Sequence, residues 1–307
     1  KKRLEIFSLE ADLSGPIASF KGSITNVPSI GNETIIIKGE SAASYIPIKN
    51  LQEYWPRSLG ADAQEWSIAN IKDGIVDKLQ AEFEVHLKGT QKGKNLEIFS
   101  VKGDMTVNDA IVTYLDTMPP ISTLVSYITF DKTKLIINID HGTSDKISFK
   151  NGRMIINGLN EKDQFADLSF DVASAFPDAL SYLDNAPLKF AKALDIPPKT
   201  TKGEVIGAIQ MQFPIEKALT LQRIDIAAKA NLKNIFMADK LVGHDIKNGQ
   251  LNLSVNKKSM RVSGQVTVNE VAANINWKEN FDISTDYKSR YTVKAHIADS
   301  KYFEYFG

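Results

Sequence analysis

The sequence predicts a mainly β fold organised around an antiparallel meander of five strands. Apolar and polar residues alternate with a period of two along many segments, which gives each strand one apolar and one polar face. Turn-forming residues separate these segments, and helical spacing is confined to two short stretches. The five meander strands are expected at residues 203–213, 224–232, 249–255, 260–268 and 273–277, with an Asn-Gly pair as one of the turns.

The chain before the meander also reads mostly as strands. Helical spacing begins near Lys49, includes Trp55 and Trp66, and predicts two short helices that end at Asp73-Gly74. Pro119 and Pro120 then favour an extended crossing instead of a helix. The expected strands are 4–13, 17–24, 34–38, 79–87, 99–107, 134–140, 154–156 and 168–172.

A second helical stretch precedes the meander. Phe176-Pro177 opens one short helix, and Pro187, at a position typical of a first helical turn, starts another. Residues 196–203 are the best candidate for a hinge, and 291–297 form the last strand. These changes of pattern divide the chain into 1–48 (N-terminal strands that continue the sheet), 49–197 (strands with short helices) and 198–307 (the meander).

Composition excludes several classes of protein. The 307 residues include 37 basic and 37 acidic side chains, without a basic block, so no nucleic-acid partner is expected. The absence of cysteine excludes disulfides and thiolate chemistry. No apolar run approaches the ~20 residues of a membrane-spanning helix. The alternation is already under way at Leu4, and we therefore expect a fragment of a longer protein.

The sequence carries no catalytic signal, and we predict neither an enzyme nor a cofactor or metal. No two of the four histidines lie within four residues of each other, and Gly-x-Ser-x-Gly is absent. Carboxylates alternate along strands at Glu82 and Glu84, and at Asp167 and Asp171. A solvated face is their expected role, and a hydrolase that uses them is a minor alternative. The histidines are His86, His141, His244 and His296.

A tetrad of apolar residue, Lys, Asx and Gly occurs three times, starting at Ile71, Phe149 and Ile246. Its irregular spacing excludes a solenoid of fixed period. Because Asn-Gly and Asp-Gly are good turn formers, we interpret the tetrads mainly as turns that lead into strands.

The apolar strand faces allow two interpretations. They form either a core filled by the protein's own side chains or the lining of a hydrophobic groove, since both need the same alternation. The groove candidates, with no chemical role beyond apolar lining, are Phe83, Val85, Phe170, Ile209, Met211, Ile226, Leu253, Val262 and Val266.

Several short motifs follow one another along the chain. The first are Tyr54-Trp55-Pro56 with Trp66, then Met118-Pro119-Pro120-Ile121. Leu183-Asp-x-x-Pro187-Leu188, Gly203 and Phe213-Pro214 come after them. This order resembles the AsmA-like superfamily, and within it the YhdP-like branch of large Gram-negative envelope proteins. The resemblance covers roughly residues 45–285 and closes at Met260-Arg-Val-Ser-Gly and Trp277-x-x-x-Phe281.

The resemblance implies a long, curled and partly open sheet that carries phospholipid in a hydrophobic groove between inner and outer membranes. It also implies a periplasmic location, an inner-membrane anchor through an N-terminal helix outside this chain, and outer-membrane or periplasmic protein partners. The alternative is a structural or assembly module of the cell envelope, with a self-filled core and protein partners at its sheet edges.

Overall fold

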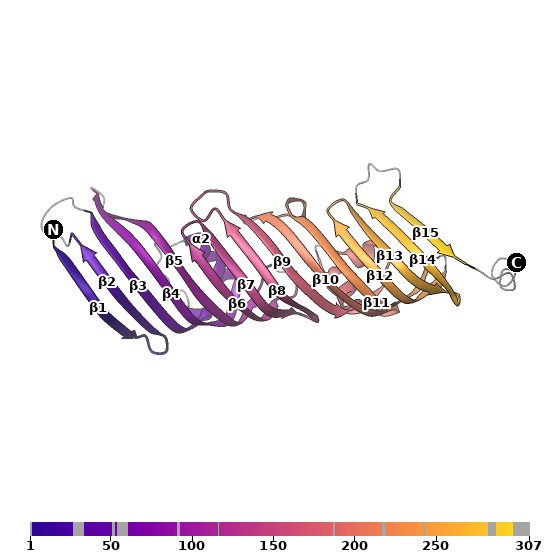
Figure 1. Ribbon diagram of the computed structural model, residues 1–307, viewed down its shortest axis with the longest axis horizontal. Coiled ribbons are helices and arrows are strands. Elements are labelled where there is room, and N and C mark those ends of the chain that lie inside the picture. The colour runs from indigo at the N-terminus through magenta and orange to yellow at the C-terminus, as the bar shows by residue number, and fades with distance from the viewer. Residues whose placement is uncertain are drawn as a thin grey trace. The chain divides into compact units, whose positions relative to one another are not determined.

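The protein forms one antiparallel sheet of 15 strands that follow one another in chain order, and the first and last strands do not pair (Figure 1). The computed structural model describes residues 2–26, 34–50, 53, 61–90, 93–115, 117–186, 188–216, 219–241, 243–281 and 287–296. The predicted fold class, a mainly β protein with an open antiparallel sheet and a few short helices, is confirmed.

Most strands extend beyond the alternating segments from which they were predicted. The first nine are β1 Arg3–Asp12, β2 Ile17–Thr25, β3 Ile35–Pro47, β4 Ile71–Thr90, β5 Gly93–Val112, β6 Ile121–Asp131, β7 Lys134–Ser144, β8 Ile147–Asn157 and β9 Phe165–Ala175. The other six are β10 Thr201–Pro214, β11 Asp225–Leu241, β12 His244–Asn256, β13 Ser259–Val268, β14 Val271–Asn280 and β15 Ser289–Ala295. The described helices are η1 Ile48–Asn50, α2 Ala61–Asn70, α3 Phe176–Leu183, α4 Phe190–Ala193, η2 Pro198–Thr200 and η3 Leu221–Arg223.

The predicted meander is confirmed as β10 to β14, each strand pairing antiparallel with the next. The helix that begins at Phe176 is also confirmed, with Pro177 in its first turn. The predicted helix end at Asp73-Gly74 is wrong, because α2 ends at Asn70 and β4 begins at the next residue. Trp55 and Pro187 lie outside the described residues.

Chain contacts divide the molecule into two units, each with its own core. Unit 1 comprises residues 1–114, 120–142 and 151–166, and unit 2 comprises 115–119, 143–150 and 167–307. The core of unit 1 consists of Ile46, Ile48, Val76, Val107 and Ala110. The core of unit 2 joins α3, α4 and β11 to β14, and Ile235 at its centre is completely buried.

The tetrads lie inside strands, so their interpretation as turns is wrong. Gly74, Gly152 and Gly249 belong to β4, β8 and β12. A Cβ atom at each glycine would lie 2.8 or 2.9 Å from an atom of a residue on a neighbouring strand. These neighbours are, in order, Ala110, Ile139 and Ile235. The strand register shifts next to the first and third glycines, which marks these two as β-bulges.

At a bulge, the alternation of side chains between the two faces of a strand shifts by one residue. In β4, Val76 and Leu79 share one packed cluster although they are three residues apart, because the register shifts between Val76 and Lys78. The same shift brings Leu232 and Ile235 of β11 into one core. The apolar face therefore stays continuous across a bulge, while the sequence alternation does not.

No helix in the described part of the chain is long and apolar enough to cross a membrane.

Candidate functional site

The apolar face of β1 to β6, here called the open apolar face, is the best candidate for a binding surface in unit 1. Phe20, Ser41, Ala81, Gly103 and Phe130 lie opposite one another on five successive strands and form one row across it. Three small residues therefore lie between the two phenylalanines of this row.

Aromatic rings lean over glycines on this face. The Phe20 ring occupies the space where Gly39 would carry a Cβ atom. It also stacks on Phe83, with ring centroids 5.9 Å apart. Between the aromatic rings, the surface of this face therefore consists of backbone and small side chains.

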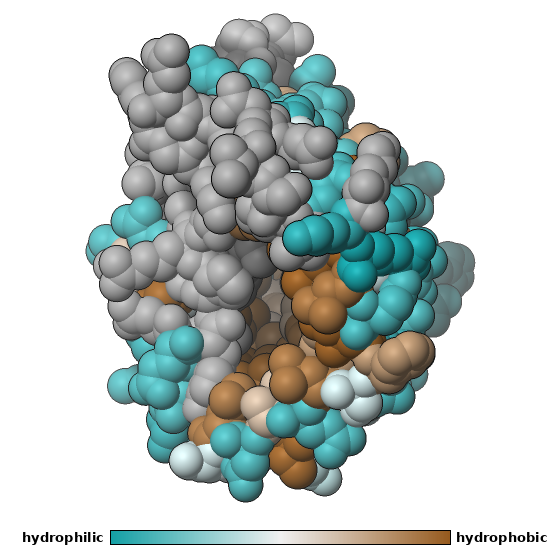
Figure 2. All heavy atoms as spheres, turned by 90° about the vertical axis from the view of Figure 1, so that its left-hand side faces the viewer, coloured by the Kyte–Doolittle hydropathy of each residue, from teal (hydrophilic) through white to brown (hydrophobic). Residues whose placement is uncertain are grey.

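Among the described residues, side chains of the open apolar face remain accessible to solvent. Leu9 is 57% exposed, while Phe20 and Phe83 are half-buried. A depression of about 260 Å³, open to solvent, lies on β1 to β4, and nearly all of its surface is apolar. Leu9, Ala18, Phe20, Ala43 and Leu79 are among its lining residues. Figure 2 looks onto the N-terminal end of the sheet, where hydrophobic residues line a hollow and hydrophilic residues lie outside it.

The opposite face of unit 1 is polar, and its charges neutralise one another. Lys21 pairs with Glu40 at 2.8 Å, and Lys102 pairs with Glu82 at 2.9 Å. Glu40 and Glu82 lie directly opposite each other, so the flanking lysines offset a repulsion between like charges.

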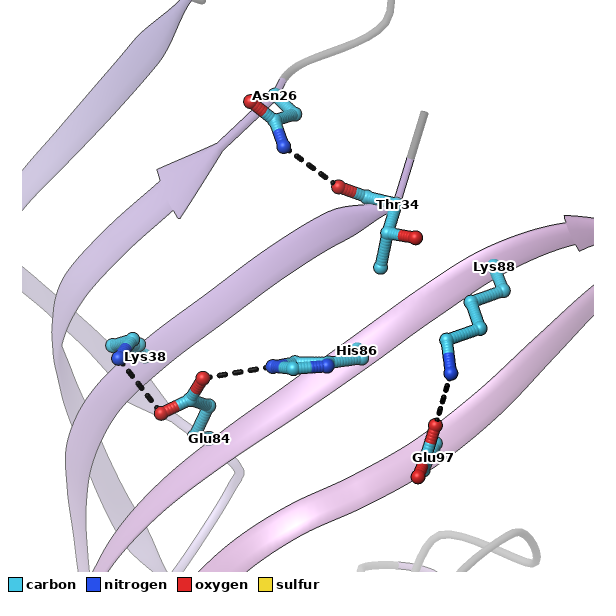
Figure 3. Close-up of polar contacts among 7 residues, drawn as sticks. All are labelled: Asn26, Thr34, Lys38, Glu84, His86, Lys88 and Glu97. Carbon is cyan, nitrogen blue, oxygen red and sulfur yellow. Dashed lines mark hydrogen bonds and ion pairs between the residues drawn. The ribbon is translucent and has the colours of Figure 1, made fainter. Parts of the chain in front are cut away.

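Glu84 lies at the centre of a second polar group on this face (Figure 3). Its carboxylate contacts the Lys38 ammonium at 2.7 Å and the His86 ring nitrogen at 2.7 Å. The hydrogen bond from Lys38, followed by that from His86, holds the pKa of Glu84 below its ordinary value. The His86 ring also stacks on Phe99, with centroids 4.9 Å apart. This arrangement fixes side chains on the sheet surface and leaves no group poised for catalysis among them.

In unit 2 the apolar face of the sheet is covered. Phe176 and Leu180 of α3 and Ala191 of α4 belong to the same buried cluster as the apolar side chains of β11 to β14. Lys146 anchors the first turn of α3 through Asp178 at 2.9 Å, where a carboxylate also favours the helix dipole. This part of the sheet therefore has a core filled by the protein itself.

One carboxylate lies within the covered face of unit 2. Glu279 is 3% exposed, and the Trp277 indole donates to it at 3.1 Å and the Ser289 hydroxyl at 2.5 Å. The Lys240 ammonium lies 5.4 Å from the centre of the Trp277 ring and donates to the Leu194 carbonyl at 2.7 Å. Burial lowers the pKa of Lys240 from its ordinary value. Glu279 follows Trp277 by two residues and therefore shares its face of β14, but it was not among the predicted site residues because a carboxylate is not expected in a core.

The structure distributes the nine predicted groove residues over three environments. Phe83 and Val85 lie on the open apolar face of unit 1. In unit 2, Val262 and Val266 are buried in the core, and Leu253 packs against it. In the third environment, Ile209 and Met211 of β10 are partly exposed, and Ile226, opposite Met211 on β11, is 37% exposed. Phe170 of β9 is also partly exposed and packs edge-on against Phe149. Lipid contact at these residues stays a prediction.

The histidines and strand carboxylates are dispersed. His141 lies 2.8 Å from Asp140, His244 lies 3.0 Å from Asn269, and Asp167 accepts a hydrogen bond from Gln212 at 2.6 Å. Within the described ranges, no three His, Cys, Asp or Glu side chains gather as metal ligands.

Comparison with known families gives one match. The sequence profile of the family described as YhdP protein matches residues 37–304 of the chain. No curated protein and no solved structure matches it.

Proposed function

This chain belongs to the YhdP family, and from that premise we propose that it is a lipid-binding segment of a cell-envelope protein. Its role is to carry phospholipid along an apolar groove between the inner and outer membranes, without chemical conversion. In the full-length protein, the segment lies in the periplasm and is anchored to the inner membrane by an N-terminal helix.

The observation that carries this proposal is the open apolar face of β1 to β6. Leucine and phenylalanine side chains remain half-exposed there around a depression of about 260 Å³. Exposed apolar surface of this kind marks binding sites. Each acyl CH₂ group removed from water contributes about 0.8 kcal/mol, so a lipid tail can be held without headgroup contacts.

The test is native mass spectrometry of the purified chain, combined with organic extraction. We expect phospholipid to co-purify with the chain or to load from liposomes. A chain that stays free of lipid after incubation with liposomes contradicts the proposal.

Two neighbouring residues of β4 provide a matched pair of variants. Ala81 lies in the row between Phe20 and Phe130, whereas Gln80 lies on the opposite, polar face. Ala81→Asp introduces a charge where the tail is expected, so we expect most of the bound lipid to be lost. Gln80→Asp introduces the same charge on the polar face and should keep the lipid. Equal lipid loads in two variants with intact β circular dichroism would place the lipid elsewhere.

The alternative function, a structural or assembly module, is favoured by a different observation in unit 2. There α3 and α4 cover the apolar face, and Val262 and Val266 are 6% and 3% exposed. A structural role for unit 2 is compatible with lipid binding by unit 1. Lipid that is retained in Ala81→Asp and released by a charge at Met211 or Ile226 would instead assign the groove to β10 and β11.

A further inference from the structure

The polar face of β11 to β15 carries a row of cations. Lys229, Ser254, Arg261, Lys278 and Arg290 lie opposite one another on five successive strands. Neighbouring strands are about 4.8 Å apart, so three of these cations lie side by side on β13, β14 and β15. We call this set the Lys229 row.

The rows beside it add hydrogen-bonding groups and one more cation, Lys294. One row is formed by Asn231, Asn252, Ser263, Asn276 and Thr292, and the next by Gln250, Gln265, Asn274 and Lys294. Across these three rows the five cations are accompanied by no carboxylate, and the described residues form no ion pair with any of them.

This arrangement differs from the polar face of unit 1. There Lys21 and Lys102 flank Glu40 and Glu82, and the pairs neutralise the surface. On the Lys229 row, the cations repel one another, which destabilises the sheet unless anions lie over it. Arg290 stacks on the Tyr287 ring, 3.9 Å from its centroid, and is thereby held beside Lys278.

A depression with a mixed polar and apolar lining adjoins the row. It has a volume of about 370 Å³, and Ser263, Asn274, Asn276, Thr292 and Lys294 are among its lining residues. This volume lies within the range of small-ligand sites. The depression therefore places amide, hydroxyl and ammonium donors next to the cations of the row.

We propose that the polar face of β11 to β15 docks on the phosphate groups of an anionic phospholipid surface. Guanidinium groups bind phosphate oxygens with two parallel hydrogen bonds, and the lysines add positive charge. The neutral rows match the ester and hydroxyl oxygens that flank each phosphate of a headgroup. This surface belongs to unit 2, whereas the proposed tail-binding groove belongs to unit 1, so the inference goes beyond that groove.

The test is flotation of the full chain with vesicles of phosphatidylcholine alone or with 30% phosphatidylglycerol. The variant combines Arg261→Gln, Lys278→Gln and Arg290→Gln. The control combines Lys21→Gln, Lys38→Gln and Lys102→Gln, which removes three cations that are already paired. Circular dichroism verifies the fold of each protein.

We expect wild type to prefer the anionic vesicles, and this preference should weaken at high salt. Loss of three cations near the surface should lower partition onto anionic vesicles roughly 100-fold. The control should change it only slightly. Binding to phosphatidylcholine alone reports the apolar face and should be equal in all three proteins.

Three outcomes would overturn the proposal. Wild type could show no preference for anionic vesicles, the Lys229-row variant could float like wild type, or the control could lose as much binding. Binding of polyglutamate to the chain is measured as well. If polyglutamate binds the Lys229 row while anionic vesicles do not, the partner is an acidic protein. Loss of this docking with retained lipid in mass spectrometry would leave the proposed function intact.

Discussion

The packing of Ile235 against two glycines of the neighbouring strands gives the most quantitative prediction. Ile235 of β11 is completely buried between Gly203 of β10 and Gly249 of β12. A Cβ atom at Gly249 would lie 2.9 Å from the Ile235 Cβ, which is closer than side chains normally approach. The backbone of Gly249 itself does not exclude alanine, because it is outside the left-handed region. A methyl group at residue 249 would therefore overlap the Cβ of Ile235 and lie close to its carbonyl oxygen.

The expected magnitudes follow from packing. Ile235→Ala removes three carbon groups, worth about 0.8 kcal/mol each, and leaves a cavity, for a total loss of about 3–4 kcal/mol. Gly249→Ala overpacks the space beside Ile235 and should cost about 1–2 kcal/mol. Ile235→Ala keeps the Cβ that would lie 2.9 Å from the new methyl group, so the overlap remains in the double variant. The destabilisation of the double variant should therefore be close to the sum of the two single variants, within about 1 kcal/mol.

Urea unfolding monitored by tryptophan fluorescence measures these values. In a Trp55→Phe and Trp66→Phe background, only Trp277 reports, and it belongs to the core of unit 2. A double variant that is more stable than the sum of the single variants by more than about 1 kcal/mol would show that the γ and δ carbons of Ile235, and not its Cβ, fill the space over Gly249. A loss below about 1 kcal/mol for Ile235→Ala would contradict its complete burial.

Three further predictions concern other contacts. Gly39→Ala should destabilise unit 1 by about 1–3 kcal/mol, because the new methyl group overlaps the Phe20 ring; unchanged thermal unfolding would refute this. Trp277→Phe removes a donor from buried Glu279 and should cost about 2 kcal/mol or more, with a smaller cost in a Glu279→Gln background; equal costs in urea unfolding would deny the hydrogen bond its role. Since burial lowers the pKa of Lys240 from 10.5, the unfolded chain binds more protons just below that pH, and stability should rise as pH approaches 10.5. Lys240→Met should remove this rise, and an identical pH profile for the variant and wild type would refute it.

The strand meander could be predicted from sequence because its alternation is uninterrupted. In β13, Met260 and Val262 face the core, and Arg261 between them faces solvent. The predicted segment 260–268 corresponds closely to β13, Ser259–Val268. Here the local pattern and the final register agree, so sequence reasoning was sufficient.

Parts of β4 and β11 lie outside the strands predicted from the sequence, and a register shift is the cause in both. Alternation in β11 breaks at Asn234, which has a φ of 53°, and the core positions change from even to odd residue numbers. A period-two pattern therefore ends at Leu232, although the strand continues to Leu241. The same break separates residues 71–78 from the predicted strand 79–87 in β4. Such bulges depend on neighbouring strands, and the Asx-Gly pairs that mark them resemble turns.

The candidate site was only partly accessible to sequence reasoning. The apolar face of β4 is evident from Phe83 and Val85, but the identical pattern at Val262 leads to a buried core. What distinguishes the two places is the helix pair α3 and α4, which comes from another part of the chain. The Lys229 row likewise depends on which strands are neighbours, and no local charge run reveals it.

The helices that cover unit 2 are inserted between β9 and β10, which are neighbours in the sheet. Likewise η1 and α2 lie between the paired strands β3 and β4. Each of these helical segments is thus part of an enlarged hairpin loop, and lengthening such a loop costs little closure entropy. A change in one such connection can therefore cover or expose part of an apolar face while the pairing of the strands beneath it stays the same.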